Sequence, residues 1–105
     1  MGADVLQLRI GWTDDAVVLG LAGELDLAAA DELEVAMRRL AATPARHIVV
    51  DLADLEFVDS SGLRALLRAR ETVVASGRTL AMTNPAPAVE RVFDITGTGA
   101  LLQLA

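Results

Sequence analysis

The chain has 105 residues, of which 53% are hydrophobic, so residues 1–105 suffice for one compact domain and leave no room for a second. Because there is no cysteine and only one histidine, we exclude a disulfide framework, thiolate chemistry and metal sites built from several imidazoles. The net charge is −6 and the nine basic residues are all dispersed arginines, so we expect no direct contact with nucleic acid.

The apolar segments are short, and the N-terminus lacks the features of an export signal. No basic stretch precedes an apolar core there, so we expect no signal peptide. Apolar runs such as residues 16–22 fall well below the roughly 20 residues that cross a bilayer. We therefore expect a cytoplasmic protein that works without a membrane, a metal or a cofactor.

The first 25 residues predict a β-hairpin. Residues 5–10 form a mostly apolar strand, and a polar turn follows at residues 11–15. Residues 16–23 are rich in β-forming side chains and end at a glycine. Trp12 lies at the turn, where it either anchors a partner or covers the edge of the core.

A helix follows this hairpin. Asp26 is a suitable N-cap for a helix that runs to about Ala42. Its inward face is predicted to carry Leu33, Met37 and Leu40. The helix is expected to stop before Pro44, because proline disfavours the helical conformation of the residue before it.

The middle of the chain predicts a buried strand, a loop and a long helix. The apolar run HIVVDL, residues 47–52, is typical of a central strand, and residues 53–59 are expected to form a loop. A helix is predicted from about Ser60 to Ala75, and Gly77 is a natural residue to follow its end. The apolar stripe of this helix is expected to contain Leu63, Leu66, Leu67, Val73 and Val74.

The last third predicts three short elements. Residues 79–84 form a strand, and Pro87 begins a helix with Val89, Val92, Phe93 and Ile95 facing inward. A final strand is expected to contain Leu101, Leu102 and Leu104. The resulting order, β-β-α-β-α-β-α-β, predicts an α/β domain in which the opening hairpin makes the sheet mixed.

The stretch FVDSSGL, residues 57–63, admits a structural and a functional interpretation. Either hydroxyl, of Ser60 or of Ser61, can cap the helix that begins there. The same helix N-terminus also suits a phosphate, since its unpaired amides carry a partial positive charge. Arg64 and Arg68 follow Ser60 at intervals of four residues on one helical face, whereas Glu56 and Asp59 would repel a phosphate.

The other polar residues give weaker evidence for a catalytic or ligand-binding site. A serine nucleophile needs a base within hydrogen-bond reach. His47 begins the strand whose far end leads to the serines, so a whole strand length is expected to separate it from them. Glu24 and Asp26 are two acids at a strand-to-helix turn, which can bind metal but more often cap and solvate a turn. The Gly-rich residues 96–99 are a weak match to a phosphate loop. We therefore expect no enzymatic activity.

Several segments resemble the STAS domain, and specifically the small stand-alone anti-sigma factor antagonists of bacteria. The resemblance is carried by GELDLAAADEL (23–33), HIVVDLADLEFVDSSGLRALL (47–67) and PAVERVFDITG (87–97), in the family's order and near its spacing. It covers essentially the whole chain. It implies a mixed β-sheet with helices packed mainly on one side.

The resemblance also implies a partner-switching function. In this family the unphosphorylated protein binds an anti-sigma factor that is also a serine kinase, and so releases a sigma factor. Phosphorylation of one loop serine ends the binding, and a serine phosphatase restores it. The family pattern places the phosphoacceptor at Ser60, flanked by Asp59, with Ser61 and Gly62 completing the motif.

Further residues follow from the same pattern. Glu24 and Asp26 match the family's GELD turn, near the partner surface. Arg64 departs from the pattern, because a small residue usually stands there; it is expected to neutralise the phosphate in part or to contact a different partner. We expect a monomer. Accessory subunits of ABC-type lipid transporters, scaffold subunits of stress-sensing assemblies and small-ligand modules are the alternative functions.

Overall fold

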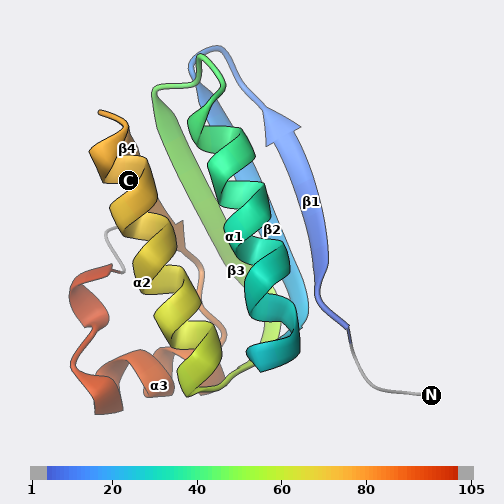
Figure 1. The fold of residues 1–105 in the computed structure, drawn as a ribbon. Coiled ribbons are helices and arrows are strands. Elements are labelled where there is room, and N and C mark those ends of the chain that lie inside the picture. Colours follow the sequence, from blue (N-terminus) through green and yellow to red (C-terminus); the bar gives the residue numbers. More distant parts are fainter. Residues whose placement is uncertain (1–4, 102–105) are drawn as a thin grey trace.

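In the computed structural model, residues 5–101 are described and form a four-stranded sheet with three α-helices (Figure 1). The following bounds define the elements in chain order: β1 (Gln7–Trp12), β2 (Ala16–Leu25), α1 (Leu27–Ala41), β3 (His47–Val58), α2 (Ser60–Ala75), β4 (Thr79–Thr83), α3 (Pro87–Thr96) and a 3-10 turn, η1 (Gly99–Leu101).

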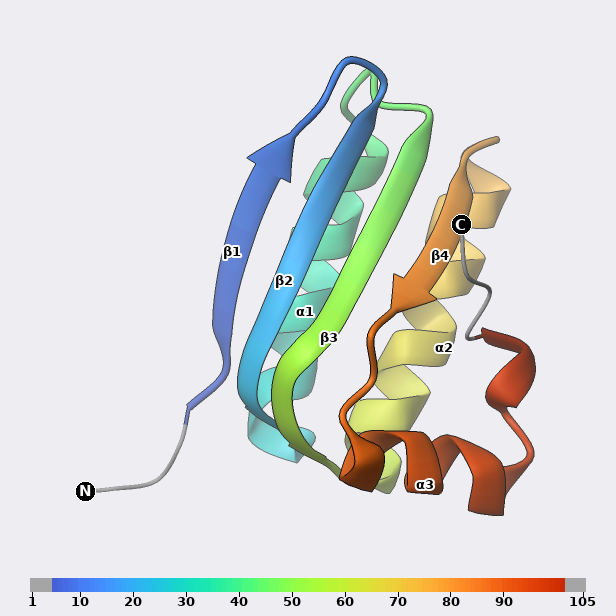
Figure 2. The same ribbon diagram turned by 180° about the vertical axis from the view of Figure 1, so that it is seen from behind.

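The sheet is mixed, as the sequence predicts. Its strand order is β1-β2-β3-β4, with β1 antiparallel to β2 and the other neighbours parallel. Crossovers between parallel strands are right-handed, so α1 and α2 fall on the same face, where they lie side by side (Figure 1). From behind, the opposite face of the sheet is bare over β1 and β2, and α3 crosses near the carboxyl end of β4 (Figure 2).

The core lies between the sheet and the pair α1 and α2. Residues of β2 alternate between buried and half-buried, which directs one row of its side chains towards the helices. The predicted inward residues of α1 are buried, and α3 buries Val89 and Phe93. Val74 and Ile95 were expected inside, but they are 50% and 77% exposed, because the inward faces of their helices are formed by other residues, such as Val73 in α2 and Phe93 in α3.

The predicted loop at residues 53–59 is wrong, because residues 53–58 continue β3 beside β2. Two register shifts in the β2–β3 ladder, between Gly20 and Ala22 and between Gly23 and Glu24, break the alternation of buried residues. The buried Leu55 and Val58 consequently lie three positions apart, a spacing that does not predict a strand.

The predicted last strand is also not found in the described part of the chain. Gly97 adopts a left-handed conformation, with φ of 71°, and the Thr98 amide donates to the carbonyl of Phe93, which ends α3 in a tight turn. Leu101 then belongs to η1 rather than to a strand, so its assignment was wrong. Leu102 and Leu104 lie outside the described residues.

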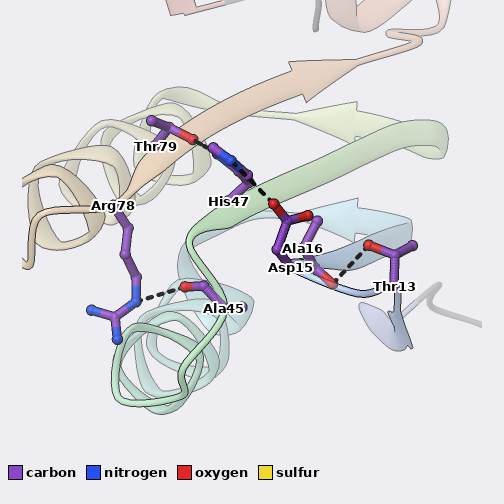
Figure 3. Close-up of polar contacts among 7 residues, drawn as sticks. All are labelled: Thr13, Asp15, Ala16, Ala45, His47, Arg78 and Thr79. Atoms are coloured by element: carbon purple, nitrogen blue, oxygen red, sulfur yellow. Dashed lines mark hydrogen bonds and ion pairs between the residues drawn. The ribbon is translucent and has the colours of Figure 1, made fainter.

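Side chains join the loops at the amino ends of the parallel strands (Figure 3). The Arg78 guanidinium donates to the carbonyl oxygens of Ala45, at 2.8 Å, and of Thr43 and Ser76. His47 lies between the hydroxyl of Thr79, at 2.6 Å, and the carboxylate of Asp15, at 3.8 Å. Arg78 therefore links the loop after α1 to the loop after α2.

Replacing Arg78 by alanine should lower the free energy of unfolding by about 1.5–3 kcal/mol, the range for hydrogen bonds from a charged group. Arg78→Lys should recover only part of this loss, because an ammonium cannot reach three carbonyls as a planar fork does. Urea unfolding followed by circular dichroism measures the change. Equal stability of Arg78→Ala and the wild type would contradict a linking role.

Candidate functional site

The fold brings together two turns that are more than 30 residues apart in the sequence. In the parallel β2–β3 ladder, Glu24 is opposite Phe57 and Leu25 is opposite Val58. The Asp59 amide then donates to the Leu25 carbonyl at 3.3 Å. We call residues 23–27 and 57–64 the paired-turn site; α1 and α2 begin there, side by side (Figure 1).

Each helix of the paired-turn site is capped by an aspartate. Asp26 accepts a hydrogen bond from the Ala29 amide at 3.1 Å, as predicted. At the second turn, however, Asp59 is the cap: it accepts from the Gly62 amide at 2.8 Å. The prediction of a serine cap was wrong because Asp59 has the extended backbone of an N-cap, with φ of −100° and ψ of −174°, whereas Ser60 and Ser61 are already helical.

The aspartate cap leaves both serine hydroxyls without a hydrogen bond to the rest of residues 5–101. Exposure then distinguishes them: Ser60, the first residue of α2, is exposed, and Ser61 is half-buried. A modifying enzyme reaches an exposed hydroxyl without unfolding the helix. Exposure therefore favours Ser60 over Ser61; the capping argument left these two serines equivalent, and the family pattern chose Ser60.

Gly62 has a packing role that the sequence did not reveal. A Cβ on this buried residue would lie 2.1 Å from the carbonyl oxygen of Leu25. Only glycine allows α2 to start this close to the end of β2. Gly62 was predicted to contact a partner. In the structure it is buried, and it lets the first turn of α2 lie against the end of β2.

The two predicted arginines differ in their surroundings. Arg68 forms an ion pair with Glu34 of α1, with a separation of 3.0 Å, and so ties the two helices together. Arg64 is exposed one turn after Ser60 and is the only basic residue within the paired-turn site. It is therefore the one cation of that site available to a phosphate or a partner carboxylate.

Four acids lie in or directly next to the same two turns. Glu24, Asp26 and Asp59 are half-buried, and Glu56 is exposed at the end of β3. The unpaired amides of the two helix starts carry partial positive charges that offset them only in the first turn. Negative charge added at Ser60 would thus enter a site that already holds three half-buried carboxylates.

Sequence reasoning missed two apolar residues of this surface. Leu27, the first residue of α1, is 74% exposed, and Phe57 in β3 is 46% exposed. Large apolar side chains beside a polar centre are characteristic of surfaces that bind proteins. Leu27 does not belong to the apolar stripe that α1 buries, and an apolar residue outside that stripe is the sequence signal for an exposed position. Phe57 was missed because residues 53–59 were predicted to form a loop.

The paired-turn site holds no serine–histidine pair. His47 begins β3 and Ser60 follows its end, so a strand of 12 residues separates them. No group of three or more histidine, aspartate or glutamate side chains suited to a metal occurs within residues 5–101. In the same residues, no helix has the length and apolar character to cross a membrane. What the site can do is bind a partner and accept a modification.

Known proteins that resemble this chain belong to one family. The family model described as "Mlab, STAS domain" matches residues 8–103. A protein of Lysinibacillus sphaericus named anti-sigma F factor antagonist is 35% identical over 83% of this chain and 75% of its own length. A protein of the same name from Paenibacillus polymyxa is 30% identical over 88% of this chain and 80% of its own length.

Two solved structures share the fold. The anti-sigma factor antagonist SpoIIAA in its unphosphorylated form is 29% identical, with a TM-score of 0.76 over 96% of this chain and 88% of its own. The Bacillus cell fate determinant SpoIIAA in its phosphorylated form is 28% identical, with a TM-score of 0.70 over 96% of this chain and 91% of its own. The same fold thus accommodates both states of that protein.

The identity of the helix cap can be tested by substitution. Asp59→Ala should lower the free energy of unfolding by about 1 kcal/mol, because it removes the partner of the Gly62 amide. Asp59→Asn should keep most of the stability, since asparagine caps equally well. Ser61→Ala is the matched control and should leave the thermal unfolding temperature unchanged. If Ser61→Ala lowered that temperature and Asp59→Ala did not, the cap would be Ser61 and not Asp59.

The close approach at Gly62 gives a second prediction. Gly62→Ala should destabilise the protein by about 1–3 kcal/mol, as overpacking does, because the new methyl group must displace the Leu25 backbone. Gly20→Ala is the control, since a Cβ there meets its nearest neighbours at 3.8 Å. Chemical unfolding of both variants measures the difference; equal stability would show that the approach is looser than the structure indicates.

Proposed function

The chain belongs to the STAS domain family, and we propose that it acts as an anti-sigma factor antagonist that is switched by phosphorylation of Ser60. The named relatives support the first part, and the pair of SpoIIAA structures shows that a protein with this fold exists in both phosphorylation states. The observation that carries the second part is the exposed Ser60 at the start of α2, whose hydroxyl the Asp59 cap leaves unused.

In the unphosphorylated state, the paired-turn site binds the anti-sigma factor. Leu27 and Phe57 supply exposed apolar surface, and Glu24, Ser60 and Arg64 supply polar contacts around it. Buried apolar anchors within a polar rim are the usual anatomy of such interfaces. Binding occupies the anti-sigma factor, and the sigma factor that it held is released.

Phosphorylation reverses the binding through charge. A phosphoserine adds about −1.5 to −2 charges at pH 7. At Ser60 this charge follows Asp59 directly and shares the paired-turn site with Glu24 and Asp26, and the single cation of that site, Arg64, offsets it only in part. Since about 1.4 kcal/mol changes affinity tenfold, a loss of a few kcal/mol in complementarity is enough to separate the partners.

The catalysis in this cycle belongs to the partners. The anti-sigma factor is the serine kinase, a serine phosphatase removes the phosphate, and the present chain is the substrate of both. This assignment agrees with a site that holds a reachable hydroxyl and lies a whole strand away from His47. The cycle takes place in the cytoplasm, and it involves neither nucleic acid nor a membrane on the part of this chain.

An accessory subunit of an ABC-type lipid transporter, or a scaffold subunit of a stress-sensing assembly, is the competing function. Either would use the same fold as a passive binding module. The relatives named anti-sigma factor antagonist favour the switching function over both. A phosphorylation-dependent loss of binding separates the two classes, because a passive subunit needs no modified serine.

Incubation with the cognate kinase and ATP should add one phosphate, located at Ser60 by mass spectrometry. Ser60→Asp should lower affinity for the kinase by more than about tenfold, as a fixed negative charge at the interface does. Ser60→Ala should bind like the wild type and resist inactivation by ATP. Calorimetry measures both affinities.

Ser61→Ala is the matched control for this experiment, since it removes the neighbouring hydroxyl and leaves Ser60 in place. It should be phosphorylated normally. Modification of Ser61 instead of Ser60, or equal binding by Ser60→Asp and Ser60→Ala, would refute the proposed switch.

A further inference from the structure

A groove of about 660 Å³ lies on the face of the sheet that α1 and α2 leave bare (Figure 2). Its first side is formed by Gln7 and Arg9 of β1. Their neighbour Leu8 lines a second, smaller groove with residues of α1. Because side chains alternate along a strand, Gln7 and Arg9 point to the opposite, bare face. The other side of the larger groove is formed by β3, with β2 between the two.

Two register shifts in the β2–β3 ladder shape the side that β3 forms. At each shift β3 contributes one residue more than β2, and at the second shift this residue is Glu56, which has no partner on β2. Bulges of this kind re-aim side chains, and they are frequent at sheet edges and beside functional sites. Asp54 and Glu56 are both exposed and line the groove, while Leu55 between them has its side chain in the core.

The groove has small residues beneath it and charged residues at its sides. Ala22, Gly23 and Ala53 line it, and none of the described residues around it is aromatic. Sites for small molecules, in contrast, are lined mainly by apolar and aromatic side chains that bury most of the ligand. An open groove with charged sides therefore fits a segment of another protein better than a small molecule.

The charges on the two sides of the groove are opposite in sign. Asp54 and Glu56 on β3 form no ion pair with another residue of the range 5–101, and Arg9 on β1 forms none there either. All three side chains belong to exposed residues. Protein interfaces place complementary charges opposite one another. A matching segment therefore carries a basic side chain near β3 and an acidic side chain near β1.

The groove is continuous with the paired-turn site. Gly23 belongs to both, and Glu56 directly precedes Phe57, the aromatic residue of that site that is 46% exposed. One stretch of β3, residues 54–57, thus presents two acids to the groove and an aromatic ring to the paired-turn site. A partner bound over Phe57 therefore borders the groove.

We propose that the groove receives a segment of the anti-sigma factor that carries a lysine or arginine, and that this side chain binds to Asp54 and Glu56. The proposal rests on the proposed function, and it adds a contact on the bare face of the sheet to the one at the paired-turn site. Arg9 meets an acidic side chain of the same segment and so sets its direction. The charges of the groove thereby help this chain to distinguish its own anti-sigma factor from others that lack the matching charges.

The test measures, by calorimetry, the affinity of unphosphorylated variants for the kinase that modifies Ser60. Asp54→Lys with Glu56→Lys should raise the dissociation constant by more than about tenfold, because two ammonium groups would then face the basic side chain of the partner. Asp14→Lys with Glu71→Lys makes the same change of net charge at exposed positions outside the groove and the paired-turn site. This matched control should bind like the wild type.

Filling the groove tests its occupancy without a change of charge. Ala53→Phe should also raise the dissociation constant by about tenfold or more, because the ring takes the space of the partner segment. Ala75→Phe, at the exposed last residue of α2, is the matched control and should bind normally. Circular dichroism of each variant separates loss of binding from loss of folding.

The outcomes distinguish this proposal from the proposed function. Equal affinity of the wild type and the folded groove variants would overturn the groove proposal, while phosphorylation of the same wild-type sample at Ser60 would leave the switch intact. Tighter binding of Asp54→Lys with Glu56→Lys would also overturn the groove proposal, because the bound segment would then be acidic there. A wild type that neither binds the kinase nor is phosphorylated would refute the proposed function, and the groove proposal with it.

Discussion

The carbonyl oxygen of Leu25 is the point on which the arrangement of the site depends. It accepts a hydrogen bond from the Asp59 amide, and the missing Cβ of Gly62 lets the first turn of α2 approach it. Since Leu25 also ends β2 and is followed directly by the cap of α1, one atom positions both helix starts. The distance between the two turns is thereby set by backbone contacts, which surface side chains do not alter.

Asp59 and Ser60, two neighbouring residues, have different roles at the start of α2. Asp59 gives its carboxylate to the helix cap, so the hydroxyl of Ser60 has no structural duty within the described chain. Had a serine been the cap, its hydroxyl oxygen would have been held by an amide of the first helical turn and so be less available to a modifying enzyme. With an aspartate in that position, a phosphate on Ser60 would lie one residue after the cap, and its addition would cost the fold little.

Much of this could be read from the sequence, and the failures have identifiable causes. The strand and helix order as far as α3, the Asp26 cap and the end of α2 before Gly77 follow from local patterns. The path of residues 53–58 does not, because register shifts in the β2–β3 ladder hide the alternation of a strand. That single error also concealed Phe57 as a surface residue. The Asp59 cap was missed because Asp, Ser and Ser are all suitable caps and only the backbone conformation decides among them.

The two ends of the sheet differ in a way that explains how a switch can act without a change of fold. At the amino ends of the parallel strands, Arg78 links two loops through three carbonyl groups, and His47 bridges two others. At the carboxyl ends, the exposed side chains of the paired-turn site make few such links. Charge added there finds no internal hydrogen bond to break, so its effect is confined to the surface that a partner meets. A domain of this size can therefore be switched by altering its surface alone, while its core and its other contacts stay as they are.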